Sequence, residues 1–395
     1  MGKYDFTSLP NRLGHHTYKW KETETDSEVL PAWIADMDFV VLPEIRQAVQ
    51  TYADQLVYGY TYASEELIKE VQKWEATQHG YHFDKEALVF IEGVVPAIST
   101  AIQAFTKEGE AVLINTPVYP PFARSVKLNN RRLITNSLVE KDGLFEIDFV
   151  QLEKDLVEEE VKLYILCNPH NPAGRVWTKD ELQRMNDICL RHDVRVIADE
   201  IHGELIMPGY RFQPFAAVNE ACKANSVVLN SPTKAFNIAG LQIANIVCSN
   251  EEWRRRIDRV INIFEVCDVN PFGPIALEAA YNESEEWLNK LLLYIADNYA
   301  LLTDTFKEHL PDYEVLKLEG TYLVWVDIRK SGLKSDVLAE KLLHDGKVQV
   351  NSGMMYGKTA GENYIRINIA CTRATLQEGL SLIHISEPTR LGMIS

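Results

Sequence analysis

The sequence predicts an α/β protein in which a large domain with a mostly parallel central sheet is joined to a smaller α+β domain. At 395 residues the chain is longer than one simple core usually holds, so two domains are expected. From about residue 87, short apolar runs alternate with longer amphipathic segments, a pattern typical of parallel sheets covered on both faces. The expected strands cover residues 87–91, 111–115, 161–167, 194–198, 226–230 and 243–248.

The pattern changes after about residue 285, where a long helical segment leads into three further strand-like segments. We therefore expect residues 46–285 to form the large domain and residues 286–381 the small one. Residues 1–45 are expected to return to the small domain. The helical pattern TRATLQEGLSL then breaks, so residues 382–395 are predicted to be an atypical tail, to which we assign no function.

Charge and composition exclude several classes of partner. The chain has 40 Lys and Arg against 57 Asp and Glu, and a net charge of -17 repels nucleic-acid backbones and anionic lipids. No apolar stretch approaches the roughly 18 to 20 residues of a membrane span, and the N-terminus lacks an apolar signal region. Six scattered cysteines without a CxxC pair indicate reduced thiols and no metal site. We expect a cytoplasmic protein that binds neither nucleic acid nor membranes.

The candidate nucleophile is Lys234, in the segment NSPTKAFNIAGL that follows the expected strand 226–230. Ser231 and Thr233 offer hydroxyl groups beside it, and Gly240 permits close approach of the backbone. A lysine after a strand is more often a solvated surface charge. A partly desolvated lysine can instead form a Schiff base with a carbonyl compound such as pyridoxal 5'-phosphate (PLP).

Asp199 ends the apolar run VRVIA, where a carboxylate would be buried unless it met a cation. PLP chemistry requires an acidic residue at the pyridine nitrogen, because a protonated ring acts as an electron sink. A structural ion pair or a helix N-cap would explain the same residue.

Four further residues carry weaker signals. Asn171 lies in the turn-forming segment CNPHNPAGR and could donate to a phenolic oxygen, and Tyr119 in NTPVYPPF could stack on a planar cofactor. Gly93 follows a strand and precedes a helix, a place that favours an anion, and Arg366 in YIRIN could pair with a substrate carboxylate. Each of these residues also has a purely structural interpretation. Asn171 could simply belong to a turn and Tyr119 could fill a loop. Gly93 could serve a tight connection, and Arg366 could lie on the surface of a strand.

The motifs NPHNPAG, ADEIH, SPTKAFNIAGL and YIRIN, in this order, resemble the class I/II aminotransferases, which are PLP enzymes of fold type I. The resemblance covers residues from about 30 to 380. Within that family, the segments WIADMDF, YGYTY, GVVPA, NPHNPAGRVW, DEIH and KAFNIAGLQ resemble the MalY/PatB group of cystathionine β-lyases, also called C-S lyases.

The resemblance implies a role for each site residue. Lys234 would be the Schiff-base lysine, Asp199 would bind the pyridine nitrogen, and Arg366 would bind the substrate carboxylate. The other expected cofactor contacts are Asn171 at the 3'-oxygen, Tyr119 on the ring, His202 and Thr233. The residues expected to bind the phosphate are Gly93, Val94, Val95, Ser231 and, from a second subunit, Tyr60.

The shared Tyr60 implies a homodimer. One departure from the family is Gln242, because many aminotransferases have an arginine eight residues after the lysine. The phosphate contacts are therefore expected to be distributed differently from those of such aminotransferases.

The implied activity is that of a PLP-dependent carbon-sulfur β-lyase acting on L-cystathionine or related S-substituted cysteines. Its products would be a thiol (homocysteine or hydrogen sulfide), pyruvate and ammonia. An aminotransferase is the alternative, because both reactions use the same residues up to removal of the Cα proton. A regulatory role through a protein partner, alongside catalysis, is a second alternative.

Overall fold

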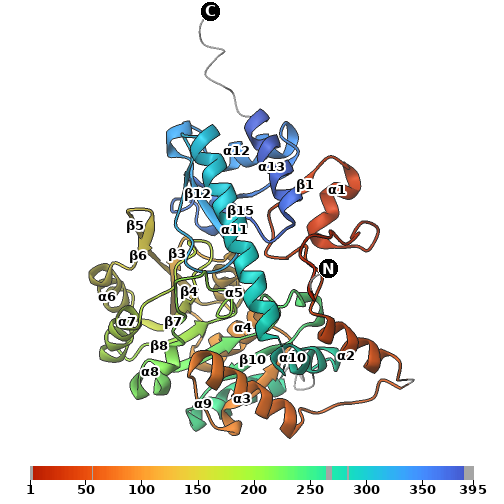
Figure 1. Ribbon diagram of the computed structural model, residues 1–395. Helices are drawn as coiled ribbons and strands as arrows, with labels where there is room; N and C mark the ends of the chain where they lie inside the picture. The colour runs from red at the N-terminus through yellow and green to blue at the C-terminus, as the bar shows by residue number, and fades with distance from the viewer. Residues whose placement is uncertain (1–2, 56, 264–268, 283, 387–395) are drawn as a thin grey trace, which may run out of the picture.

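The computed structural model describes residues 3–55, 57–263, 269–282 and 284–386. Figure 1 shows a lower part built around a large sheet and an upper part built around a smaller one, with the helix Glu285–His309 (α11) running between them. The α/β fold class predicted from the sequence is confirmed. The exact domain boundaries stay a prediction.

The large sheet has seven strands in the order β2-β10-β9-β8-β7-β3-β4. Five neighbouring strands, from β9 to β4, are parallel, and β10 is antiparallel to both of its neighbours. Its strands are β2 (Leu88–Ile91), β3 (Ala111–Thr116), β4 (Arg132–Ser137), β7 (Val161–Cys167), β8 (Arg195–Asp199), β9 (Ser226–Asn230) and β10 (Ala244–Val247).

All six predicted strands of this sheet are present, within one or two residues of the expected bounds. The sequence reading did not identify β4. This strand lies at the edge of the sheet, and most of its residues are exposed or half-buried. Because an edge strand faces solvent, it lacks the continuous apolar run that marks the central strands.

Helices cover both faces of the large sheet, as expected for parallel strands. On one face, apolar side chains of three helices pack against Val112, Ile114 and Leu163. These helices are α4 (Val94–Phe105), α5 (Pro120–Leu128) and α9 (Glu251–Ile263). The other face, including Leu113 and Leu166, packs against a second group. This group includes α3 (Glu65–His79), α6 (Phe149–Glu158), α7 (Lys179–Arg191), α8 (Glu220–Ala224) and α10 (Phe272–Asn282).

Local sequence explains where two of these helices begin and end. The hydroxyl of Thr178 accepts from the backbone N–H of Glu181, whose carboxylate accepts from the N–H of Thr178, so a capping box starts α7. Ser64 caps the first turn of α3, and Gly80 ends that helix in the left-handed conformation that glycine favours.

The upper part contains a four-stranded antiparallel sheet of order β11-β12-β15-β14. Three helices pack against this sheet: α11, α12 (Ser335–His344) and α13 (Arg373–Ser386). The strands of the sheet are β11 (Glu314–Val315), β12 (Leu323–Asp327), β14 (Asn351–Ser352) and β15 (Tyr364–Asn368). A separate hairpin is formed by β5 (Val139–Lys141) and β6 (Leu144–Glu146).

The N-terminal segment lies against this upper part (Figure 1). Its strand β1 (Leu30–Pro31) pairs in parallel with β13 (Val348–Gln349). The segment also contains α1 (Lys21–Thr25), and it leads through residues 33–39 into α2 (Pro43–Ala53), which packs on α10 of the lower part.

The helix α13 continues to Ser386, past residue 382, where the sequence reading placed the start of an atypical tail. That reading was wrong for these first residues, because Ile383 packs in the apolar core and so sustains the helix. The rest of the predicted tail, residues 387–395, lies outside the described residues. Within the described ranges, none of the helices has the length and apolar character that crossing a membrane requires.

Candidate active site

A small pocket of about 80 Å³ lies where the parallel strands of the large sheet end. Residues that follow β7, β8 and β9 meet there with the first turn of α4 and with the N-terminal segment. This is the edge at which parallel α/β sheets commonly bind ligands. The lining residues are Ala35, Val94, Val95, Tyr119, Cys167, Asn171, Asp199, Ile201, His202 and Lys234.

Lys234 projects into this pocket, and its ammonium Nζ donates a 2.8 Å hydrogen bond to the carbonyl oxygen of Ala35. Burial lowers the pKa of Lys234 to about 8, and the nearby charge of Arg366 acts in the same direction. The carboxylates of Asp36 and Asp199 oppose this shift. A substantial share of the neutral, nucleophilic amine is therefore available near neutral pH.

Asp199 is the last residue of β8, and its carboxyl group is buried. Burial raises the pKa of Asp199 to about 7, although a 3.1 Å hydrogen bond from the N–H of Ile201 and the charge of Lys234 both favour the ionised form. A buried carboxylate with so high a pKa is best satisfied by a cationic partner. The Asp199 side chain therefore suits a protonated ring nitrogen.

Arg366 reaches from β15 to the edge of the pocket, although it is not among the lining residues. Its Nη1 donates to Asn171 Oδ1 at 3.0 Å and its Nη2 to the carbonyl oxygen of Trp33 at 2.5 Å. The guanidinium lies 4.9 Å from the ring centre of Tyr356. Its buried Nε has no hydrogen-bond partner among the described residues, so the group retains a donor for an anion.

His202 and Tyr119 flank the pocket as the sequence reading expected. Burial lowers the pKa of His202 to about 3, and the charges of Lys234 and Arg366 add to the effect, so the imidazole is neutral. Within the described ranges, its buried Nδ1 makes no hydrogen bond. The N–H of Tyr119 donates to the carbonyl oxygen of Asn171 at 3.1 Å, which fixes these two residues side by side.

The first turn of α4 presents Val94 and Val95 to the pocket, and Gly93 is the N-cap of this helix. The free N–H groups of a helix N-terminus favour an anion. The hydroxyls of the loop before Lys234 are used locally: Ser231 Oγ donates to the carbonyl oxygen of Ile243 at 2.6 Å, and Ser231 and Thr233 share a 2.7 Å hydrogen bond.

Tyr60 lies away from the pocket. Its side chain is 100% exposed, in the connection between α2 and α3 that reaches away from the rest of the chain at the lower right of Figure 1. Among the residues that the structure describes, no contact brings Tyr60 to Lys234.

The sequence reading missed three residues that line the pocket, Ala35, Cys167 and Ile201. Ala35 lies in WIADMDF, which was noted only as part of a family resemblance. The contact of Ala35 with Lys234 is made by a backbone carbonyl, so the side chain carries no signal for it.

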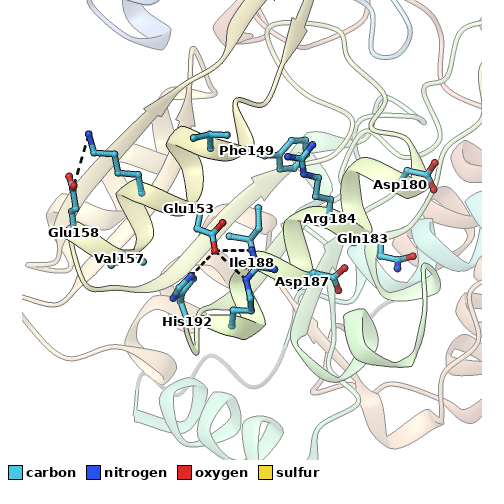
Figure 2. Close-up of a pocket in the computed structure, with 13 residues that line it drawn as sticks. Phe149, Glu153, Val157, Glu158, Asp180, Gln183, Arg184, Asp187, Ile188 and His192 are labelled. Carbon is cyan, nitrogen blue, oxygen red and sulfur yellow. Dashed lines mark hydrogen bonds and ion pairs between the residues drawn. The ribbon is translucent and has the colours of Figure 1, made fainter.

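A larger surface hollow, between α6 and α7, contains none of the expected site residues. Figure 2 shows that charged side chains line it together with the apolar Phe149, Val157 and Ile188. Glu153 is bonded there to Arg191 and His192. The pocket at Lys234 combines perturbed ionisable groups with convergent donors, so it is the better candidate for chemistry.

A mostly parallel sheet covered on both faces, with a part-buried lysine and a buried aspartate where its strands end, is the architecture of a fold type I protein. The chain belongs to the family described as Aminotransferase class I and II, whose model matches residues 34–383.

Individual relatives are similar over nearly the whole chain. "Cystathionine beta-lyase PatB" of Bacillus subtilis (strain 168) is 37% identical over 382 residues, which are 96% of this chain and 98% of that protein. A solved structure of cystalysin from Treponema denticola, which contains pyridoxal 5'-phosphate, superposes with a TM-score of 0.94 at 35% identity and covers 97% of this chain and 98% of its own. A PLP-bound putative aminotransferase from Clostridium difficile 630 has a TM-score of 0.93 at 38% identity, covering 97% and 99%.

Proposed function

We propose that this chain is a PLP-dependent carbon-sulfur β-lyase that cleaves L-cystathionine or related S-substituted cysteines. The observation that carries the PLP chemistry is the meeting of Lys234 and Asp199 in one pocket where the parallel strands end. The relative PatB, which is named a cystathionine β-lyase, and cystalysin, which contains PLP, support this choice of reaction and cofactor.

The residues of the pocket fit the proposed cofactor. Lys234 would hold it covalently, and Asp199 would keep a proton on its ring nitrogen. Asn171 and His202 would contact its 3'-oxygen side and Tyr119 its ring face, consistent with their places around the pocket. When bound, PLP supplies an electron sink for the negative charge that develops at Cα.

The phosphate end of the cofactor would lie at the N-terminus of α4, against the backbone of Gly93, Val94 and Val95. The loop of Ser231 and Thr233 precedes Lys234 and would complete this end. Gln242 brings no positive charge, so the N–H groups of the helix carry more of the phosphate binding.

We further propose a homodimer in which Tyr60 of one chain completes the phosphate site of the other. The full exposure of Tyr60, together with Val57, Tyr58 and Tyr62 at 77%, 58% and 89%, supports this arrangement. Large apolar side chains that gather on one exposed segment are typical of an interaction surface.

For the reaction, Arg366 would bind the substrate α-carboxylate through its fork of N–H donors. The neutral amine of Lys234 would remove the Cα proton, and the same amine, now protonated, would lie near the departing sulfur. Overall, cystathionine and water become homocysteine, pyruvate and ammonia, and cysteine would give hydrogen sulfide in place of homocysteine.

An aminotransferase is the second candidate, supported by the family itself and by the Clostridium difficile neighbour with that description. The two reactions differ in whether the proton returns to the cofactor or the Cβ–S bond breaks. Only the aminotransferase needs a keto acid as a second substrate.

The deciding experiment supplies PLP-loaded protein with L-cystathionine and no keto acid, and measures pyruvate and thiol. We expect both in equal amounts from the wild type and none from Lys234→Ala, with unchanged far-UV circular dichroism. Lys127→Ala, which changes an exposed lysine, is the control and should keep full activity. Turnover only after a keto acid is added would establish the aminotransferase, and failure to bind PLP would remove both assignments.

We propose the cytoplasm as the compartment. The five cysteines among the described residues, Cys167, Cys189, Cys222, Cys248 and Cys371, are free and buried, as suits a reducing environment. Cys267 lies outside the described residues. A regulatory role beside catalysis would require a protein partner, because the net charge of -17 disfavours nucleic acid.

A further inference from the structure

Residues 33–39, which we call the strap, contribute Ala35 to the lining of the pocket and bond to both Lys234 and Arg366. The carbonyl oxygen of Ala35 accepts from Lys234 Nζ, and that of Trp33 accepts from Arg366 Nη2. Lys234 belongs to the large sheet's loops and Arg366 to the small sheet. The strap is therefore a direct connection between the lysine and the arginine.

On the lysine side, the strap is bonded to Asn237, three residues after Lys234. Its Nδ2 donates to the carbonyl oxygens of Met37 at 3.1 Å and Phe39 at 2.9 Å, and its Oδ1 accepts from the N–H of Met37 at 3.2 Å. Asn237 has a φ of 57°, a left-handed conformation that asparagine tolerates better than most residues.

On the arginine side, the strap is bonded to Asn368, two residues after Arg366. Its Nδ2 donates to the carbonyl oxygens of Ile34 at 2.7 Å and Asp36 at 2.8 Å, while its Oδ1 accepts from the N–H of Ala370. Asn368 is almost completely buried, with an exposed fraction of 2%. Both amide groups thus use their two N–H donors on strap carbonyls.

The strap also forms ion pairs with two basic residues that precede it in the chain, Lys19 and Arg12. Lys19 Nζ donates to Asp38 Oδ2 at 2.7 Å and to the carbonyl oxygen of Asp36 at 2.9 Å. Arg12 forms two 2.8 Å bonds with the carboxylate of Asp36. With so many contacts, the strap has little freedom to adjust, so a shift on one side is passed to the other.

We propose that Asn237 and Asn368 are positioning residues that set the spacing between Lys234 and Arg366 through the strap. The inference rests on the proposed function, in which a single amino-acid substrate must present its Cα proton to Lys234 and its carboxylate to Arg366. Loss of either amide would let that spacing vary, and a displacement of about 1 Å can lower a rate by up to about 100-fold.

The first test is independent of activity and uses hydrogen–deuterium exchange of the cofactor-free, full-length chain. Asn368→Ala should speed exchange of the strap peptide, including the Met37 N–H, although the Asn368 side chain bonds no N–H of the strap. Asn225→Ala is the matched control, because this buried amide donates likewise to two oxygens, Asn186 Oδ1 and the carbonyl of Val194, which lie in α7 and directly before β8, away from the strap. Exchange raised equally by both variants, or by neither, would overturn the proposal.

The second test is a double-mutant cycle on the PLP-loaded enzyme, with Asn237→Gly chosen because glycine keeps the left-handed backbone. Each single variant should lower kcat/KM by about 10- to 100-fold. The double variant should be within about 3-fold of the worse single one, since both act through one strap. Multiplied losses, or single variants as active as the wild type, would refute it. Asn368→Ser replaces Asn368→Ala if the latter does not fold.

These tests separate the two levels of inference. A wild type that binds no PLP or releases no pyruvate would remove the proposed function, while the exchange measurement would still report on the strap. Normal lyase activity with unchanged strap exchange in Asn368→Ala would remove only the positioning role.

Discussion

At the residue scale, the pocket holds two ionisable groups whose pKa values are shifted toward each other. Burial moves the pKa of Lys234 down to about 8 and that of Asp199 up to about 7. Each side chain is thus close to the point at which it gives up or takes a proton near neutral pH. Burying these two groups lowers the free energy of unfolding of the cofactor-free chain.

The destabilisation that comes from burying Lys234 depends on pH. The pKa of Lys234 is about 8 in the folded chain against an ordinary value of 10.5, so the folded state binds fewer protons than the unfolded state between these values. The contribution of Lys234 to stability should therefore become less unfavourable as pH increases from about 8 to 10.5, and its full destabilising effect is present below about pH 8.

Lys234→Met, which replaces the amine by an apolar group of similar length, should remove this destabilisation. We expect a thermal midpoint about 1 to 3 °C above that of the wild type at pH 7 in the absence of PLP, with the gain shrinking toward pH 10.5. Differential scanning calorimetry from pH 6 to 10.5 measures this. A constant difference at every pH would show that packing, not the charge, is responsible.

At the residue scale, the sequence indicated where polar side chains that end or follow a strand would lie, while their roles stay a prediction. Lys234, Asp199 and Asn171 could be placed together because the carboxyl ends of parallel strands meet at one edge of the sheet. Asn237 and Asn368 could not be found in this way. Their partners are backbone carbonyls about 200 and 330 positions away in the sequence, and no local pattern marks such contacts.

At the scale of elements, apolar runs located the buried strands, and the exposed edge strand β4 escaped detection because periodicity reports burial and not hydrogen bonding. The end of α13 was misjudged for a related reason. Its last turns are sustained by packing of Ile383 against the core, a tertiary contact that outweighs a weak local pattern.

A buried ion pair connects the segment before β12 to the loop after β7. Arg175 Nη1 and the N–H of Val176 donate to Glu319 Oε2 at 2.6 and 2.9 Å, and both charged side chains are only 8% exposed. Glu319→Ala would leave Arg175 with one fewer partner in a buried place, and we expect the free energy of unfolding to fall by about 3 kcal/mol.

Urea denaturation measures this loss, and Glu319→Gln should lose less because the amide oxygen still accepts a hydrogen bond. Glu362→Ala is the surface control: its pair with the exposed Lys334 should contribute under about 1 kcal/mol. Equal losses for Glu319→Ala and Glu362→Ala would mean that the buried pair does not stabilise the connection.

At the scale of the whole molecule, one chain supplies every proposed cofactor contact except Tyr60. Its exposure is what a residue shared between two chains would show in a single chain, and the composition alone could not predict where the second copy lies. The arrangement can be tested by combining two low-activity variants of the chain in one dimer.

Tyr60→Phe and Lys234→Ala variants should each have low activity alone. When the two chains are unfolded and refolded together, half of the dimers should be mixed, and each mixed dimer should contain one site with both residues intact. Activity should recover to about one quarter of the wild-type value. Recovery equal to the sum of the separate variants would exclude a shared site, and sedimentation would report the assembly directly.

The hydrogen bond between Lys234 and the carbonyl oxygen of Ala35 has a consequence for the ageing of the protein. An amine that is half neutral near pH 8 reacts with aldehydes in general, including the open-chain sugars and metabolic aldehydes that glycate proteins. The amine lies in a pocket that Tyr119, Val94 and Asp199 help to line, so an aldehyde must enter this pocket to reach it. We therefore expect the shape of the pocket to limit which aldehydes react, and a variant that widens it should accumulate glycation at Lys234 during storage without PLP.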